Sequence, residues 1–197
     1  MSALTDALNR IMEWLQQNSP ICASGFQPGL SPEEVEEKLG EIPFCVSREV
    51  HELYQWCNGT NDRCGVFVYH YLLDLDTALQ YSQGFNDSYW LEVRERDGDP
   101  LHLFLIFDFD GEYFAVTGSD NLNDTAPIFH VGCDDGSLSF AFTNLTNMML
   151  ALAECYETGV YTVASDGYVE VTDEAKFGDI RRKHNPGAVK QLYAQGW

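Results

Sequence analysis

The sequence predicts an α+β fold in which an antiparallel or mixed sheet meander is flanked by helices. Four strand-like runs follow one another between residues 101 and 142, separated by Asp-Gly pairs or short polar loops. Amphipathic helical patterns occur on both sides of these runs. A chain of 197 residues with 45% hydrophobic residues can bury the core that such a domain needs.

The N-terminal part is expected to be mainly helical. Residues 3–17 repeat apolar side chains every three or four positions, which is typical of an amphipathic helix. Residues 18–29 have the Gly, Pro and Ser content of a loop. A short helix should follow, because Ser31 can cap it, Glu34 completes a capping box and Gly40 can end it.

A further helix is expected from Ser47 to Cys57, with the Asn58-Gly59 pair as its left-handed terminator. The composition of this segment raises the question of whether Cys57 is a catalytic thiol. His51 lies six residues earlier, about 120° around the helix, so the two side chains cannot face each other. A nucleophile needs its base within hydrogen-bond reach, so we interpret the segment as a packing element.

The middle of the chain should form the sheet. Residues 65–73 are rich in β-branched and aromatic side chains and suit a strand, and a short helix is expected over 75–82. The segment 85–100 fits a helix and a strand equally well, and both remain open. The expected strands of the meander are 101–109, 112–118, 126–132 and 137–142.

The C-terminal part begins with an expected helix from Thr143 to Glu157, capped near Thr143 or Asn144 and stopped by Gly159. A strand-like hairpin with Asp166-Gly167 at its turn and a basic helical stretch follow. We therefore expect three regions. These are an N-terminal helix and loop that pack on the domain (1–29), the main domain (30–159), and a C-terminal hairpin with a basic helical extension (160–197).

The charge of the chain is strongly negative and unevenly distributed. The formal net charge is -20, and residues 97–174 hold fifteen acidic residues and no Lys or Arg. An acidic surface repels nucleic acid and anionic membranes and attracts basic proteins or cations. We therefore expect a basic protein partner and no nucleic acid or membrane partner. Solubility alone is the alternative explanation of the acidity.

The sequence also indicates a compartment. Polar residues interrupt every apolar run near the N-terminus, so neither a signal peptide nor a membrane span is expected, and we predict a cytoplasmic protein. The six cysteines include no CxxC pair. Free thiols are therefore expected, with no zinc site and no disulfide frame.

No catalytic or cofactor-binding motif is present. The sequence lacks GxSxG, HExxH, a Walker loop and a dinucleotide fingerprint, so we predict no catalytic residue, no cofactor and no metal. His70, His102 and His130 lie in expected strands and can converge. Histidines among apolar neighbours are more often hydrogen-bonded core residues, and we favour that interpretation.

Alternating carboxylates from Asp108 to Glu112 are similar to the start of a calcium loop. An EF-hand counted from Asp108 needs Gly at the sixth position and Glu at the twelfth, but Tyr113 and Ser119 stand there. A strand that ends in an Asp-Gly turn explains the same residues without a metal. The calcium alternative would gain support if the strand order brought the acidic loops at 118–125 or 132–137 beside Asp110.

The order of motifs resembles the SUKH superfamily, the SMI/KNR-type domain of fungal cell-wall assembly regulators and many bacterial proteins. An E-E helix start, a Gly-x-x-Pro turn, an Asn-Gly pair and a late Ser-Phe pair before a helix carry the resemblance over residues 30–157. Two features depart from the pattern, since Thr-Asn follows "SFAF" and the tail from Val160 lies outside the shared core. The signature positions are Glu34, Gly40, Pro43, Asn58, Gly59, Ser139 and Phe140, together with Glu33, Leu39 and Leu53.

The resemblance implies an α+β domain that binds other proteins and catalyses no reaction. Many bacterial members look like immunity proteins that neutralise a toxin, often a nuclease. The leading hypothesis is therefore an immunity-type inhibitor of a basic partner. The expected contacts are Asp108, Asp110, Glu112, Asp134 and Asp135.

Three alternatives remain open. The first is a regulatory or scaffolding adaptor that docks elsewhere through its basic C-terminal segment. The second is a hydrolase that uses Cys57 or Cys64, and the third is a calcium-binding domain. The sequence does not determine the oligomeric state.

Overall fold

The structure is a computed structural model that describes residues 2–61, 65, 67, 69–89, 102–132, 137–164 and 168–186. Its centre is a five-stranded sheet with the strand order β3-β4-β5-β6-β7, in which every neighbouring pair is antiparallel. The strands are β3 (Tyr71–Leu72), β4 (Leu103–Phe109), β5 (Glu112–Thr117), β6 (Ile128–Val131) and β7 (Leu138–Phe142). The predicted α+β class and the antiparallel meander are confirmed.

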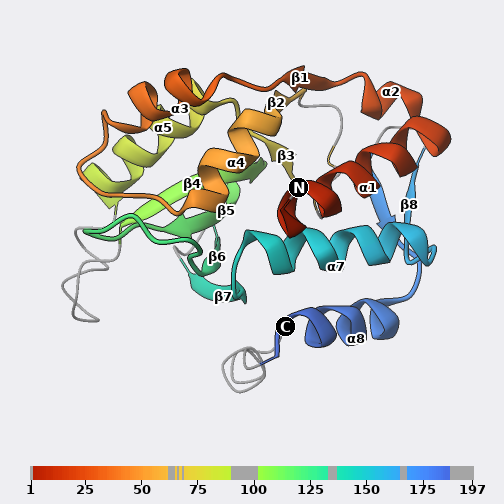
Figure 1. Ribbon diagram of the computed structural model, residues 1–197. Coiled ribbons are helices and arrows are strands. Elements are labelled where there is room, and N and C mark those ends of the chain that lie inside the picture. The colour runs from red at the N-terminus through yellow and green to blue at the C-terminus, as the bar shows by residue number, and fades with distance from the viewer. Residues whose placement is uncertain are drawn as a thin grey trace.

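The elements before the sheet form a helical layer beside it (Figure 1). This layer also contains a two-stranded ribbon formed by β1 and β2. The elements are α1 (Ala3–Asn18), α2 (Pro20–Ala23), β1 (Phe26–Pro28), α3 (Pro32–Leu39), α4 (Arg48–Trp56) and β2 (Cys57–Thr60). Sequence patterns predicted α1, α3 and α4, but residues 20–28 were expected to be a loop and instead form α2 and β1.

Helix α5 (Leu75–Gly84) follows the edge strand β3, and a short π-helix (Phe85–Tyr89) continues it. Residues 85–89 of the ambiguous segment are therefore helical, and its remainder lies outside the described residues. The strand expected over 65–73 is shorter than predicted among the described residues. It contains β3 and an isolated bridge between Phe67 and His70.

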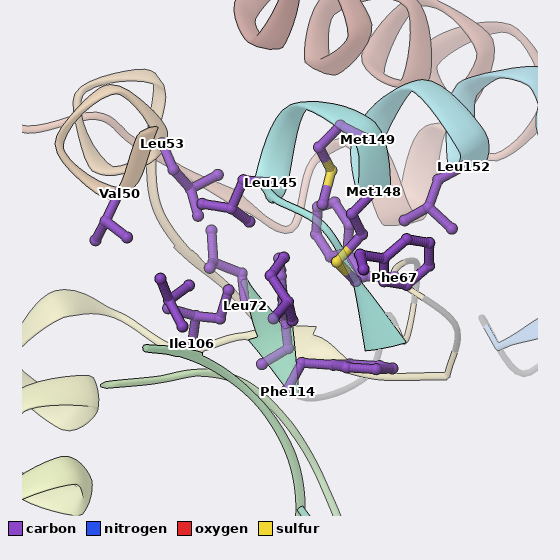
Figure 2. Packing of buried hydrophobic residues seen from close by; sticks show 14 of the residues in the cluster. Val50, Leu53, Phe67, Leu72, Ile106, Phe114, Leu145, Met148, Met149 and Leu152 are labelled. Atoms are coloured by element: carbon purple, nitrogen blue, oxygen red, sulfur yellow. The ribbon is translucent and has the colours of Figure 1, made fainter. Parts of the chain in front are cut away.

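Helix α7 (Leu145–Glu157) closes the core over one face of the sheet. Met148 of α7 and Phe114 of β5 point into the same apolar cluster, together with Leu53 of α4 and Phe67 (Figure 2). Helix α1 lies alongside α7 (Figure 1), and its buried side chains belong to the same cluster. The predicted cap of α7 is Asn144, whose side chain accepts a hydrogen bond from the Asn147 N–H.

The C-terminal segment forms a hairpin of β8 (Tyr161–Val163) and β9 (Val169–Val171), followed by α8 (Glu174–His184). Helix α8 runs beside α7 (Figure 1). Tyr161 and Ile180 are buried and belong to the same hydrophobic cluster as the rest of the domain. The predicted turn at Asp166-Gly167 lies outside the described residues.

The Asn58-Gly59 pair does not terminate α4, which corrects the sequence prediction. The helix ends at Trp56, and Asn58 and Gly59 belong to strand β2. Asn58 Oδ1 accepts the backbone N–H of Leu75 at 2.9 Å, and Gly59 has φ +97°. A Cβ at Gly59 would come within 2.9 Å of the Asp74 nitrogen, so the pair joins β2 to the start of α5.

Candidate functional site

The thiol of Cys57 is a buried structural group. It is 2% exposed, and its Sγ donates to the Gly59 carbonyl at 3.0 Å. Burial raises the pKa of this thiol to about 11, although hydrogen bonds to backbone groups of residues 27 and 59 act in the opposite direction. A thiol that stays protonated at neutral pH is a poor nucleophile. Cys64, the other thiol considered for a hydrolase, lies outside the described residues.

The carboxylate of Asp108 is buried and accepts hydrogen bonds from other residues of the sheet and its β4–β5 turn. It is 7% exposed, its Oδ2 accepts the Tyr71 hydroxyl at 2.5 Å, and its Oδ1 accepts the Gly111 N–H at 3.2 Å. Burial, followed by this bond to Asp108, raises the pKa of Tyr71. The hydrogen bonds stabilise the turn between β4 and β5 and leave Asp108 little surface for contact with a partner.

Asp110 and Glu112 lie at the exposed end of the same hairpin. Asp110 has φ +51° and Gly111 φ +85°, as an Asp-Gly turn between antiparallel strands requires. Asp110 is exposed, and the Glu112 side chain is 46% exposed. Both carboxylates are therefore available at the surface.

The register of the sheet determines which other segment lies near Asp110. Tyr113 of β5 pairs with Val131, the last residue of β6, and Val131 pairs with Leu138, the first residue of β7. The β6–β7 connection therefore leaves the sheet at the same end as the β4–β5 turn. Asp134 and Asp135 belong to this connection but lie outside the described residues.

Two of the three strand histidines approach each other. The rings of His70 and His130 have centroids 6.1 Å apart, and His130 Nε2 lies 3.5 Å from Glu112 Oε2. His102 instead stacks on Phe44, with ring centroids 4.8 Å apart. No group of three or more His, Cys, Asp and Glu side chains within the described ranges is arranged to hold a metal ion.

A cavity of about 420 Å³ lies between the sheet and α8. Its sheet wall is mainly aromatic and includes Phe109, Phe114, His130, Ser139 and Phe142. Its helix wall consists of Glu174, Phe177, Gly178, Arg181 and Arg182 on the sheet-facing side of α8, with Tyr69 and His70 at one side.

The cavity was not predicted from the sequence. His130 and Ser139 are cross-strand partners, which only the register of β6 and β7 reveals. The α8 residues belong to a segment that the sequence described only as a basic extension. The available signal was the spacing of Glu174, Phe177, Gly178 and Arg181, which lie on one helical face at intervals of three and four residues.

The positions of the SUKH-like signature are mostly structural. Glu34 and Ser31 form the predicted capping box of α3, and Gly40 caps its C-terminus with φ -67°. Pro43 is exposed in the connection to α4, and Ser139 and Phe140 pair with His130 and Phe129 in the sheet. Most of these positions have a role in the fold that needs no ligand.

The helices within the described ranges do not combine the length and apolar character needed to cross a membrane. A comparison with models of known protein families gave no match, and a search of curated proteins gave no relative.

Proposed function

We propose that this chain is a non-enzymatic protein-binding module that binds a basic protein through carboxylates at one end of its sheet. We call this region the acidic end, and define it as Asp110, Glu112, Asp134 and Asp135. An immunity-type inhibitor of a basic toxin such as a nuclease is the specific form of the proposal. The single observation that carries it is the sheet register, which directs the β4–β5 turn and the β6–β7 connection to the same end.

The charge balance supports the proposal. The formal net charge of -20 already includes the cations of the chain, and several of the described cations are each paired with a carboxylate. A negative surface of this kind accelerates association with a basic partner, and added salt weakens the attraction. The pairs are Arg10 with Glu157, Lys38 with Asp76, Arg48 with Asp124, Arg182 with Asp179 and Lys183 with Glu154.

The properties of Cys57 argue against the hydrolase alternative in that segment. Its thiol pKa of about 11 keeps the thiolate scarce at neutral pH. The calcium alternative loses Asp108 as a free ligand, because one of its oxygens accepts a hydrogen bond from Tyr71 of β3 and the other accepts the Gly111 N–H. Binding through exposed carboxylates requires neither an activated thiol nor a metal.

The test compares two variants that remove three negative charges each. One carries Asp110→Asn, Asp134→Asn and Asp135→Asn at the acidic end, and Asn tolerates the positive φ of position 110. The other carries Glu33→Gln, Glu36→Gln and Glu37→Gln on the exposed face of α3. Binding to a panel of basic nucleases is measured by calorimetry at low and high salt, with inhibition of each nuclease as a second readout.

We expect the acidic-end variant to weaken binding at least about tenfold more than the α3 variant, because removing a specific interfacial charge costs more than removing a remote one. If both variants lost the same amount of affinity, the interaction would be a non-specific charge attraction. Affinity that does not change with salt would overturn the electrostatic basis of the proposal.

The adaptor alternative remains the second candidate because α8 carries basic residues at both ends, with Lys176 in its first turn and Arg182 and Lys183 in its last. Deleting residues 176–197 would also remove the buried side chain of Ile180, so loss of function in that deletion would be ambiguous. Charge reversal at the exposed Lys176 tests the adaptor without opening the core. The adaptor predicts lost docking, whereas inhibition through the acidic end should persist.

A further inference from the structure

We infer that the cavity between the sheet and α8 is a binding site for a small ligand with a planar aromatic body and one anionic group. This inference goes beyond the proposed protein-binding function and uses a different region of the chain. It rests on four observations: the size of the cavity, a glycine in its helix wall, the aromatic character of its walls, and the position of one arginine.

The first observation is the size of the cavity relative to normal packing. The cavity is partly open to solvent, and it is much larger than the few small voids of a normally packed interior. A volume of about 420 Å³ lies within the range of about 300–1,000 Å³ that small-molecule sites occupy. The cavity is therefore large enough for a compact ring system.

The second observation is a glycine on the cavity side of α8. Gly178 lies within the helix, where glycine is less favourable than alanine. A Cβ at this position would meet the Arg182 guanidinium at 3.4 Å. The chain thus accepts a weaker helix and leaves space at the centre of the helix wall.

The third observation is the shape of the two walls. Phe109, Phe114 and Phe142 on the sheet side and Phe177 on the helix side present rings to the cavity. Aromatic rings pack well against other flat rings in offset or edge-to-face arrangements. These walls favour a planar aromatic body over a flexible polar one.

The fourth observation is the position of Arg181. Its guanidinium carbon lies 5.4 Å from the centre of the Phe142 ring and 5.5 Å from that of Phe177. These two rings hold the guanidinium at the cavity wall, where its planar set of N–H donors suits a carboxylate or sulfonate. Arg181 is one of two arginines in the helix wall, and the other, Arg182, is paired with Asp179.

The opposite side offers polar groups that can orient the ligand. His70, His130 and Ser139 line the cavity near Glu112. A ligand site of this kind is mainly apolar and contains a few placed polar groups, and this cavity has that composition.

The test uses two fluorescent probes of similar shape and different charge. Anilinonaphthalene sulfonate is anionic, and phenylnaphthylamine is its uncharged counterpart. Each is titrated into the full-length protein, and binding is measured by fluorescence and by calorimetry. The variants are Gly178→Phe, which fills the cavity, and Arg181→Gln, which removes the cation. Their matched controls are Gly178→Ala and Lys176→Gln, and circular dichroism confirms that each variant is folded.

We expect saturable binding of one molecule of anionic probe per chain. Arg181→Gln should weaken the anionic probe about tenfold or more and leave the neutral probe within about twofold, because a charge-assisted hydrogen bond is lost only with the anion. Gly178→Phe should abolish binding of both probes. The controls should retain it.

Several results would overturn the inference. Unchanged binding by a folded Gly178→Phe protein would place the probe elsewhere. If Arg181→Gln weakened the binding of both probes equally, Arg181 would not recognise an anionic group, and the ligand would not need one. Absence of saturable binding would show that the cavity holds no such ligand. Probe binding that decreases as the protein concentration rises would show that a second copy of the chain occupies the cavity.

Discussion

The carboxylate of Glu49, on α4, accepts the backbone N–H of Thr146 at 2.9 Å, at the first turn of α7. It also accepts the Leu145 N–H at 3.2 Å. Glu49 is 6% exposed, and burial raises the pKa of its carboxyl although the hydrogen bonds from residues 145 and 146 lower it. One helix therefore caps another, and the two helices covering the sheet depend on each other.

Glu49→Ala is expected to destabilise the protein by about 1–3 kcal/mol, because the backbone N–H groups of Leu145 and Thr146 lose their acceptor. Glu49→Gln should cost less, since its amide oxygen still accepts one bond and no buried charge remains. Urea unfolding at neutral pH measures both values. An alanine variant as stable as the original chain would show that the N–H groups find other partners.

The attachment of α8 to α7 is expected to weaken in acid. Hydrogen bonds from Lys183 and His184 lower the pKa of Glu154 below its ordinary value. A lowered pKa in the folded state adds stability above the unfolded pKa, and this stability is lost as the pH falls through the folded pKa. Hydrogen exchange should therefore show weaker protection of α8 between pH 7 and about pH 3.

The matched variant for this prediction is Glu154→Gln, which cannot ionise. It should show weaker protection of α8 already at neutral pH and a smaller further decrease in acid. If acid lowers the hydrogen-exchange protection of α8 equally in both proteins, carboxylates other than Glu154 control its attachment to α7.

Cys57 is expected to react very slowly with iodoacetamide in the folded protein. With a pKa of about 11, about one thiol in ten thousand is ionised at pH 7, and the side chain is buried. Cys45, which is partly exposed, provides the comparison within the same chain. Peptide mass spectrometry should find Cys57 unlabelled until denaturant is added, and rapid labelling of the folded state would reopen the hydrolase hypothesis.

Gly59→Ala is expected to destabilise the protein by about 1–3 kcal/mol, because alanine is strained at φ +97° and its Cβ meets the Asp74 backbone. Gly84→Ala is the control. A Cβ at Gly84 has no atom within 4 Å, so stability should stay equal or rise by up to about 1 kcal/mol. Thermal unfolding distinguishes the two, and equal effects would contradict the role of Gly59 as a close joint between β2 and α5.

Local sequence patterns were sufficient where a few neighbouring residues determine the structure. The capping box of Ser31 and Glu34, the Asp110-Gly111 turn and the apolar stripe of α1 all follow from interactions within about one turn or one hairpin. These features also determined the fold class, because alternating strands separated by tight turns pair with their sequence neighbours.

Patterns failed where two states satisfy the same local signals. Asn58-Gly59 suits a helix terminus and a strand with positive φ equally well, and pairing of β2 with β1 decides between them. The same limit applies to Asp108, because the Tyr71 hydroxyl that binds it comes from a neighbouring strand.

The sequence by itself determined the helices α1, α3, α4 and α7, the antiparallel meander and the acidity of the chain. Only the tertiary structure decided that Asp108 is buried, that two acidic segments leave the sheet at one end, and that α8 forms a wall of a cavity with His130 and Phe142. The physical reason is that burial, register and cavities arise from contacts between residues far apart in the chain. No local pattern specifies those contacts.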